Sequence, residues 1–348
     1  MDDKNLTPLS ELGEFSLIAE LPAWAGDYGK SPNLEVGIGD DCAVIDKNDK
    51  EFELVTKDLL TEGVHFDLAY TPLMHLGYKS VVVNLSDIYA MNGKAEYIVV
   101  GLAMSSKFTY EAVRELYTGI VTACRQYGVT LIGGDTTTSK SGLTISITAM
   151  GSVEKTKLCR RKGAKDKELL VVTGDLGAAY MGLQLLEREK RVFKDAPTTQ
   201  PDLEGNDYVL ERQLKPEARK DIVALLDQLE VTPTSMIDVS DGLASEIIHL
   251  SKASDVGFMI YDEKIPVDPT THNLAREFNL DPSTTALNGG EDYELLFTIK
   301  QEDYDKIKGN PNLTVIGHAQ EKTKGCEYTD HQNGVHPLVA QGWDSFKD

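Results

Sequence analysis

Short apolar runs that end in glycine and aspartate recur along this sequence and limit how it can fold. The first lies in residues 36–45, where Gly37 and Gly39 precede Asp40 and Asp41. Glycine lets a backbone approach a ligand closely where an apolar run ends. The pattern therefore predicts strand ends that present carboxylates to a cleft.

The adjacent carboxylates of Asp40 and Asp41 need nearby positive charge if both are to stay ionised in a sheltered site. No Lys or Arg lies within five residues of the pair. The charge would then come from basic side chains elsewhere in the fold or from a divalent metal. The alternative is an acidic turn at a strand end, and this segment alone favours neither interpretation.

Four further places carry a similar signal. Asp58 ends an apolar stretch, Asp87 interrupts a helical apolar pattern, and two glycines precede Asp135. Asp238 and Asp241 lie at an expected strand-to-helix junction. Each has an ordinary alternative, such as a solvent-facing side chain or a helix N-cap, but these alternatives do not predict repetition. A cluster of such carboxylates requires cations, and oxygen ligands favour Mg²⁺ over zinc or copper. Mg²⁺ held by aspartates and glycine-rich backbone indicates a phosphoryl-transfer site.

The alternation of strand and helix patterns predicts a mixed α/β (α+β) fold. The expected helices span 9–21 (closed by Pro22), 79–91, 110–127, 177–186, 219–229 and 243–253. The expected strands include 36–45, 53–56, 95–104, 143–151 and 169–173. The charged stretch 187–216 is expected to be a loop.

A change of charge at residues 154–167 marks the expected boundary between two domains, 1–153 and 154–348. This segment is basic in an otherwise acidic chain and leads into a new apolar strand. The basic run is either a solvated linker or a source of Arg160 or Arg161 for a nucleotide phosphate, which suits the fork of donors on arginine.

Composition excludes several classes of partner and location. A formal net charge of −21 argues against nucleic acid or an anionic membrane as partner. The four cysteines are widely spaced without a Cys-x-x-Cys pair, which fits reduced thiols better than disulfides or zinc. The apolar run 97–104 is too short to span a bilayer, and the start lacks a basic n-region. We therefore expect a soluble cytoplasmic protein.

Five segments together resemble the thiamine-monophosphate kinase family, in the family's order and over nearly the whole chain. They are GIGDDCAVI (37–45), NLSDIYAM (84–91), LIGGDTT (131–137), IDVSDGL (237–243) and GGEDYEL (289–295). The resemblance implies the two-domain aminoimidazole-ribonucleotide synthetase-like fold. Its N-terminal domain would bind ATP and Mg²⁺ and pair its sheet across a homodimer, and its C-terminal domain would close over the site.

The resemblance also implies a set of ligands for several Mg²⁺ ions. These positions, with the adjacent Asp40 included as a candidate, are Asp40, Asp41, Thr56, Asp58, Asp87, Asp135, Asp238 and Asp241. Lys57 is a departure, because many relatives have a threonine metal contact there. A charged lysine side chain cannot ligate Mg²⁺, so either the backbone carbonyl of Lys57 contacts the ion or its ammonium group replaces part of the positive charge.

The implied reaction is phosphorylation of thiamine monophosphate by ATP, giving thiamine diphosphate. The implied ATP contacts are Tyr117, Gly134, Asp135, Arg161 and Ser240, and the implied substrate contacts are His65, Glu291 and Trp343. Trp343 would lie over the thiazolium cation, a contact favourable by roughly 1 kcal/mol or more when desolvated, or it packs near the C-terminus. Because the acceptor oxygen is already ionised at neutral pH, we assign no general base and expect direct in-line transfer. The alternatives are another ATP-using enzyme of the same superfamily or a non-catalytic nucleotide or Mg²⁺ sensor.

Overall fold

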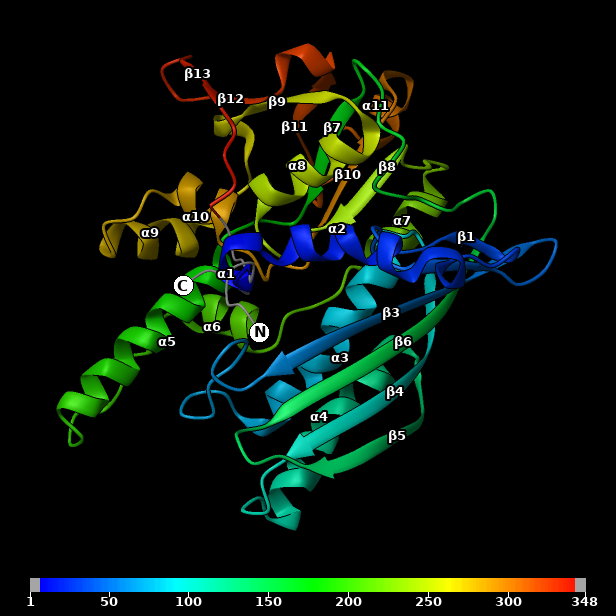
Figure 1. Cartoon of the computed structure of the whole chain (residues 1–348). Helices are drawn as coiled ribbons and strands as arrows, with labels where there is room; N and C mark the ends of the chain where they lie inside the picture. The colour runs from blue at the N-terminus through cyan, green and yellow to red at the C-terminus, as the bar shows by residue number, and fades with distance from the viewer. Residues whose placement is uncertain (1–6, 342–348) are drawn as a thin grey trace.

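Two mixed β-sheets, one in each half of the chain, organise this computed structural model, which describes residues 7–341 without the side chains of Phe15 and Tyr28. The first sheet has the strand order β1-β2-β3-β6-β4-β5, and the second has the order β13-β12-β9-β11-β7-β10-β8. The first sheet lies below the second in Figure 1. The predicted mixed α/β character is confirmed.

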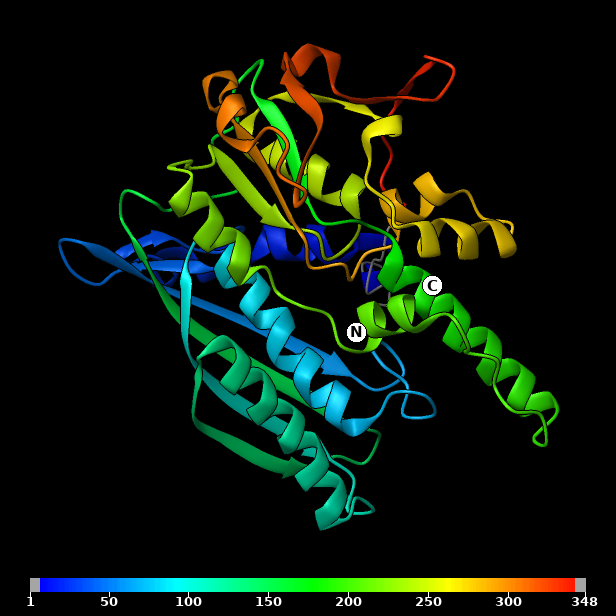
Figure 2. The same cartoon turned by 180° about the vertical axis from the view of Figure 1, so that it is seen from behind.

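The first sheet is covered on one face by two long helices. Its strands are β1 (Leu34–Val36), β2 (Ala43–Asp46), β3 (Glu51–Thr61), β4 (Lys94–Met104), β5 (Thr130–Thr138) and β6 (Thr144–Glu154). Helices α3 (Leu73–Ala90) and α4 (Tyr110–Tyr127) pack side by side on this sheet, as the view from behind shows (Figure 2). Only the pair β4 and β5 is parallel, and β5 forms an edge of the sheet.

Alternation of side chains along the strands separates the two faces of this sheet. In β6, Ile145, Ile147 and Ala149 are buried and belong to the core under α3 and α4, while the residues between them are only partly buried. Successive side chains of a strand point to opposite faces. The opposite face is the more exposed one, and it carries the large apolar side chains of Leu59 and Tyr97.

The second sheet has a hydrophobic core on each face. Its strands are β7 (Leu169–Thr173), β8 (Ser235–Asp238), β9 (Gly257–Tyr261), β10 (Leu295–Ile299), β11 (Leu313–Gln320), β12 (Cys326–Thr329) and β13 (Val335–Pro337). Leu296 of β10 packs in the core with α8, and its neighbours Leu295 and Phe297 pack in the other core with α7. This burial on both faces explains the uninterrupted apolar runs of β7 and β10.

The remaining helices lie around the second sheet and at the start of the chain. They are α1 (Leu9–Leu12), α2 (Glu14–Ala25), α5 (Ala178–Asp195), α6 (Asp207–Leu214), α7 (Lys220–Gln228), α8 (Leu243–Ser254), α9 (Pro269–Glu277), α10 (Pro282–Asn288) and α11 (Tyr304–Ile307). Short 3₁₀ turns are η1 (Gly26–Gly29), η2 (Asp262–Lys264), η3 (Gln301–Asp303) and η4 (Lys322–Lys324). Within residues 7–341, no helix has both the length and the apolar character that crossing a bilayer requires.

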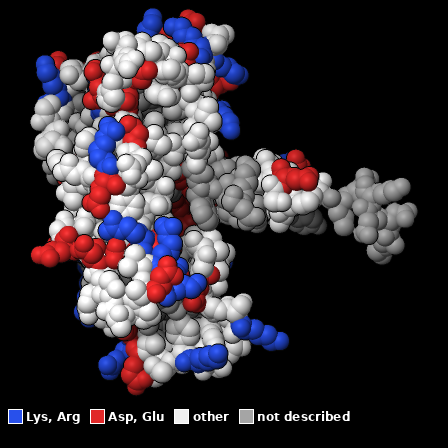
Figure 3. All heavy atoms as spheres, turned by 90° about the vertical axis from the view of Figure 1, so that its left-hand side faces the viewer, with Lys and Arg blue, Asp and Glu red and all other residues white. Residues whose placement is uncertain are grey.

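Helix α3 connects the two halves of the molecule. It packs on the first sheet and also contacts β8, and Ala90 at its end belongs to a core of the second sheet. Polar contacts reinforce this junction, since Lys79 of α3 donates to the backbone oxygen of Gln213 on α6 at 3.0 Å. Acidic and basic side chains are interspersed over both lobes on the face shown in Figure 3, so the net negative charge is not gathered into one patch there.

Three expectations about local structure are wrong. The helix expected over 9–21 is two helices separated at Gly13, whose φ of 77° interrupts the helix, and Pro22 lies inside α2 one turn before its end. A proline there removes only one late hydrogen bond. The stretch 36–45 is not one strand, because residues 37–42 form a loop between β1 and β2. The charged stretch 187–216 contains the end of α5 and all of α6, since its charges occupy the exposed face of amphipathic helices.

Candidate functional site

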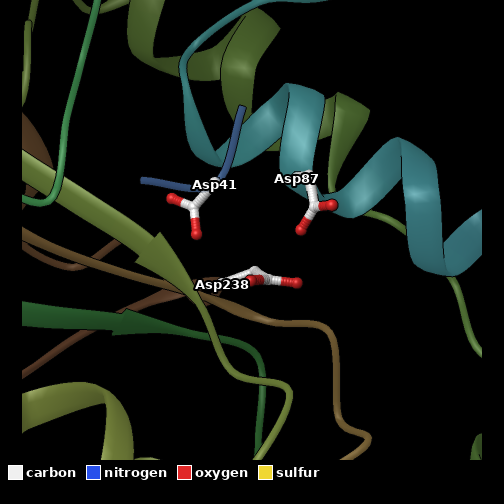
Figure 4. Close-up of side chains that lie close together, drawn as sticks. All are labelled: Asp41, Asp87 and Asp238. Atoms are coloured by element: carbon white, nitrogen blue, oxygen red, sulfur yellow. The ribbon is translucent and has the colours of Figure 1, made fainter. Parts of the chain in front are cut away.

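Three aspartates that are far apart in the sequence converge where the two halves of the molecule meet. Each of Asp41, Asp87 and Asp238 offers a carboxylate oxygen, and these oxygens all lie within 4.8 Å of one another. Asp41 comes from the loop before β2, Asp87 from α3 and Asp238 from the end of β8, and their carboxylates face a common space in Figure 4. Acids from distant parts of the sequence therefore meet as predicted, but only Asp238 lies at a strand end, whereas Asp41 is in a loop and Asp87 in a helix.

Neighbouring polar groups hold each carboxylate of this acidic triad in place. Thr56 on β3 donates to Asp87 Oδ2 at 2.5 Å. Ser86 on α3 donates to Asp238 Oδ2 at 2.6 Å and so joins the two halves of the molecule. Arg161 donates to Asp41 Oδ1 through Nε at 3.0 Å and Nη2 at 2.5 Å.

Burial and mutual repulsion disfavour the charged forms of these acids. Burial raises the pKa of Asp238 to about 7, and the nearby Asp41 adds to this shift. The pKa of Asp87 is raised well above its usual value, first by burial and then by Asp58 and Asp238. Burial alone raises the pKa of Asp58 to about 6. Arg161 opposes the shift at Asp41, but one guanidinium cannot neutralise four carboxylates.

The donor set fits a divalent oxygen-binding cation such as Mg²⁺. All the converging groups are carboxylates, which are hard oxygen ligands. Asp41 Oδ2 is buried and has no hydrogen-bond partner among the described residues. A buried carboxylate oxygen without a partner is costly, and a bound cation would remove that cost. Asp41, Asp87 and Asp238 are therefore the residues that would hold the ion.

A cavity of about 530 Å³ lies beside the triad and contains several of the predicted site residues. Those among its lining residues are Asp58, His65, Asp87, Asp238, Ser240, Asp241 and Glu291. A larger cavity of about 760 Å³ lies elsewhere, beside Lys264 and Tyr304. Because the larger cavity is not lined by the clustered acids, the smaller one is the better candidate for chemistry.

The loop that carries Glu291 is shaped by a close approach of backbones. The Glu291 N–H donates to the Ser240 oxygen at 2.7 Å, and a Cβ on Gly290 would lie only 2.6 Å from that same oxygen. Gly290 also has a φ of 78°, which side chains rarely adopt. This explains the second glycine of the GGEDYEL segment and places Glu291 beside Ser240.

His65 and Glu291 both face the cavity but differ in charge. His65 Nδ1 accepts a hydrogen bond from the backbone N–H of Thr61 at 3.1 Å. Burial lowers the pKa of His65, so its ring is neutral at physiological pH. The Glu291 carboxylate forms an ion pair with Lys79, with Nζ and Oε1 2.8 Å apart.

Asp40 and Asp241 lie near the triad without belonging to it. Asp40 Oδ1 accepts the backbone N–H of Arg161 at 3.2 Å, and burial raises the Asp40 pKa to about 6. Burial also raises the Asp241 pKa to about 6. The Asp241 N–H donates to Glu246 Oε1 at 3.0 Å. Glu246 is a buried acid that sequence reasoning missed, because a glutamate in the first turn of a helix resembles an ordinary surface residue.

Asp135 does not join the acidic triad within one chain. β6 and β4 lie between β3 and β5, so Asp58 and Asp135 are separated by three strand spacings, about 14 Å. They also face opposite sides of the sheet, since Asp58 is in register with buried Ile147 and Asp135 with Gly101 on the exposed face. The Asp135 side chain is exposed at the edge strand.

Three other predicted positions, Lys57, Gly134 and Tyr117, are not among the residues that line the cavity. Lys57 is exposed and points away from Thr56 and Asp58, because neighbours in a strand face opposite sides. Gly134 lies against β4, where a Cβ would lie 2.0 Å from the Val100 oxygen. Tyr117 is half-buried on α4 and packs against the first core. Trp343 lies outside the described residues.

Sequence reasoning also missed two residues that hold Glu291. Lys79 is only 3% exposed and lies in the middle of α3, and Gln213 at the end of α6 donates to Glu291 Oε2 at 3.0 Å. The signal for Lys79 was available, since a lysine on the apolar side of a helix is almost never fully buried unless it is paired. Gln213 gave no such signal, because it lies in a stretch that was expected to be a loop.

The raised acid pKa values predict how stability depends on pH. Asp58 and Asp238 titrate near pH 6 and 7 in the folded protein but near 3.9 when unfolded. The folded state therefore binds more protons between about pH 4 and 7, and the free energy of unfolding falls as pH rises through this window. We expect the unfolding temperature of the metal-free protein to fall between about pH 4 and 7, and added Mg²⁺ to restore it. Calorimetry with EDTA and then with Mg²⁺ measures this, and a flat or rising profile in EDTA would contradict the electrostatic account.

Comparison with known proteins gives consistent matches over most of the chain. Residues 39–153 match the family described as "AIR synthase related protein, N-terminal domain". Thiamine-monophosphate kinase of Bacillus subtilis is 33% identical, covering 90% of this chain and 94% of that protein. Thiamine-monophosphate kinase of Escherichia coli (strain K12) is 34% identical, covering 83% of each.

Solved structures show the same likeness. The structure titled "AaThiL complexed with AMPPCP and TMP" superposes with a TM-score of 0.82 at 30% identity, covering 97% of this chain and 99% of that one. The hydrogenase maturation protein HypE of E. coli has a TM-score of 0.67 at 15% identity, covering 95% of this chain and 100% of that one. A likeness at that identity shows a shared fold only.

Proposed function

The chain belongs to the thiamine-monophosphate kinase family, and we propose that it transfers a phosphoryl group from ATP to thiamine monophosphate, giving ADP and thiamine diphosphate. The observation that carries this proposal is the buried acidic triad beside a 530 Å³ cavity. A structural relative is described as complexed with AMPPCP, an ATP analogue, and TMP. We also propose that residues 1–153 and 154–348 act as two domains that meet at this cavity.

Repulsion between two anionic phosphates is the main obstacle to the reaction. Asp41, Asp87 and Asp238 would hold Mg²⁺, together with Thr56 and Asp58 as further oxygen ligands. Bound Mg²⁺ would supply positive charge that draws the phosphate oxygens together and stabilises the transition state. The aspartates act as holders of charge rather than as proton carriers. No general base is assigned, because the acceptor phosphate oxygen is already ionised at neutral pH.

Arg161 is proposed as the protein's own cation for the nucleotide phosphates. Burial lowers the pKa of Arg161, but the neighbouring acids, Asp41 first among them, more than offset this and raise the pKa above its usual value. The guanidinium therefore stays charged throughout the physiological range. Its Nε and Nη2 both donate to Asp41 Oδ1, which fixes the plane of the fork. Ser240 and the edge-strand residues Gly134 and Asp135 are the other proposed nucleotide contacts, with Tyr117 proposed near the adenine.

The acceptor end of the cavity suits a cation. Thiamine monophosphate carries a positive thiazolium ring, and the Glu291 carboxylate together with the neutral His65 ring would face it without electrostatic repulsion. Trp343 stays a prediction for the same ring. Lys57 points away from this region, so any metal contact from it would come from its backbone carbonyl. A cytoplasmic location and the absence of nucleic-acid partners also stay predictions.

A homodimer would bring Asp135 of one chain to the acidic triad of another. Asp135 is exposed on the open face of the first sheet, as are the apolar side chains of Leu59, Tyr97 and Ile132, which are 53%, 44% and 53% exposed. Exposed apolar clusters and unpaired edge strands are characteristic of interfaces. We propose that two copies pair through this face and the β5 edge, so that each site uses residues of both chains.

One incubation tests the function. Purified protein with Mg-ATP and thiamine monophosphate is expected to produce thiamine diphosphate, measured by chromatography against a control without protein. ADP production without thiamine diphosphate would favour another ATP-using enzyme of the superfamily. Nucleotide binding without ADP production would favour a sensor. Either result would contradict the proposed kinase reaction.

A further inference from the structure

Gln213 is a buried amide beside the cavity with one unused hydrogen-bonding atom. It lies at the end of α6, is 5% exposed and is among the residues that line the cavity. Its Oε1 is buried and has no partner among the described residues. A buried acceptor that is left unpaired is costly, so such an atom beside a ligand cavity indicates a missing donor.

The orientation of this amide is fixed by its neighbours. Gln213 Nε2 donates to Glu291 Oε2 at 3.0 Å. An ionised carboxylate only accepts hydrogen bonds, so the NH₂ group must face Glu291 and the amide oxygen must face elsewhere. Lys79 contacts both residues: its Nζ lies 2.8 Å from Glu291 Oε1 and donates to the Gln213 backbone oxygen at 3.0 Å.

This arrangement presents acceptors to the occupant of the cavity. Lys79 uses two of its three N–H donors on Glu291 and the Gln213 backbone oxygen, and the Gln213 NH₂ uses one of its two on Glu291. The acceptors in this cluster with capacity to spare belong to two cavity-lining residues: the unpaired amide oxygen of Gln213 and the remaining lone pairs of the Glu291 carboxylate. The complementary ligand group is a hydrogen-bond donor, and an amine with two N–H bonds fits two neighbouring acceptors.

We propose that Gln213, together with Glu291, recognises the exocyclic amino group on the heteroaromatic ring of the phosphate acceptor. This inference rests on the proposed function, because thiamine monophosphate carries such an amino group on its pyrimidine ring. The amine lies at the opposite end of the molecule from the phosphate that reacts. Gln213 therefore acts on substrate selection and binding rather than on the chemical step, and Lys79 acts through it as a positioning residue.

The wild-type protein tests the proposal without any substitution. We compare thiamine monophosphate with the analogue in which an oxo group replaces the pyrimidine amine. The analogue presents a carbonyl oxygen towards the two acceptors. A site built to bind an N–H group discriminates strongly against an analogue that lacks it. We expect kcat/KM to fall on the order of 100-fold or more for the analogue, mainly through a higher KM. Equal kcat/KM values for the two compounds would overturn the proposal.

A substitution assigns the discrimination to Gln213. Gln213→Met keeps the side-chain length but removes the amide, and we expect the preference for the amine over the oxo analogue to fall to about tenfold or less, while the KM for ATP is unchanged. Gln228→Met is the matched control, since Gln228 is exposed at the end of α7, and it should keep the full preference. A Gln213→Met protein that keeps the wild-type preference would overturn the proposal.

Binding measurements separate this inference from the proposed reaction. Calorimetric titration of the wild-type protein with the two compounds measures the same preference without turnover. Preferential binding of the amine without thiamine diphosphate formation would support amine recognition and contradict the kinase reaction. Turnover without any preference would support the reaction and contradict amine recognition. If Gln213→Met does not fold, the wild-type comparison still decides the question.

Discussion

Asp87→Asn is expected to lower the rate of thiamine diphosphate formation by at least about a thousandfold. Charge stabilisation by a bound metal ion is worth several kcal/mol, and each 1.36 kcal/mol corresponds to a factor of ten in rate. Asparagine has nearly the same size, and its Oδ1 can still accept from Thr56, which bonds Asp87 Oδ2 in the native protein. The loss therefore reflects the missing charge rather than a damaged fold.

The same substitution is expected to stabilise the metal-free protein. Asp87 is repelled by Asp58, Asp238 and Asp41 in a buried site, so removing its charge relieves that repulsion at neutral pH. We expect a higher unfolding temperature in EDTA together with a smaller gain on adding Mg²⁺. Asp49→Asn, at an exposed turn, is the control and should change neither quantity. Wild-type activity in Asp87→Asn would remove Asp87 from the site.

Mixing two inactive variants is expected to restore activity if each site uses both chains. Asp135→Asn and Asp87→Asn should each be inactive alone. In a random mixture half of the dimers carry one copy of each variant, and one of the two sites in such a dimer keeps both aspartates. The expected recovery is thus about one quarter of the wild-type rate for the whole mixture and about one half for purified mixed dimers.

Co-expression with two different affinity tags gives this mixture directly. The rate of thiamine diphosphate formation is measured after both tags have been used in turn to isolate mixed dimers. Asp87→Asn mixed with Asp41→Asn is the control, because both substitutions remove members of the same acidic triad and no site is left intact. Absence of recovery with the Asp135 variant, in mixed dimers that form normally, would contradict a site shared between chains.

The acidic triad was predictable because its signal is local. Asp41, Asp87 and Asp238 each lie in a short segment where polar residues interrupt an apolar pattern, and such interruptions can be recognised without knowing the fold. The helix at 110–127 and the strand at 169–173 have the predicted bounds for a similar reason, since their periodic patterns are regular.

The supporting residues were not predictable because their roles depend on tertiary contacts. Gln213 matters only because α6 packs beside α3 and the Glu291 loop, which no local pattern reveals. Glu246 resembles a helix-start acid until Asp241 is seen to donate to it. Asp135 was grouped with the other acids by motif, whereas strand order and side-chain alternation place it on the far face of the sheet.

The central claim is that acids from distant parts of the sequence hold divalent metal around the reacting phosphates. Anomalous diffraction from crystals grown with Mn²⁺ and a non-hydrolysable ATP analogue tests it most directly. We predict an anomalous peak within about 2.0–2.6 Å of carboxylate oxygens of Asp41, Asp87 and Asp238. Bound nucleotide with no peak among these three carboxylates would contradict the account.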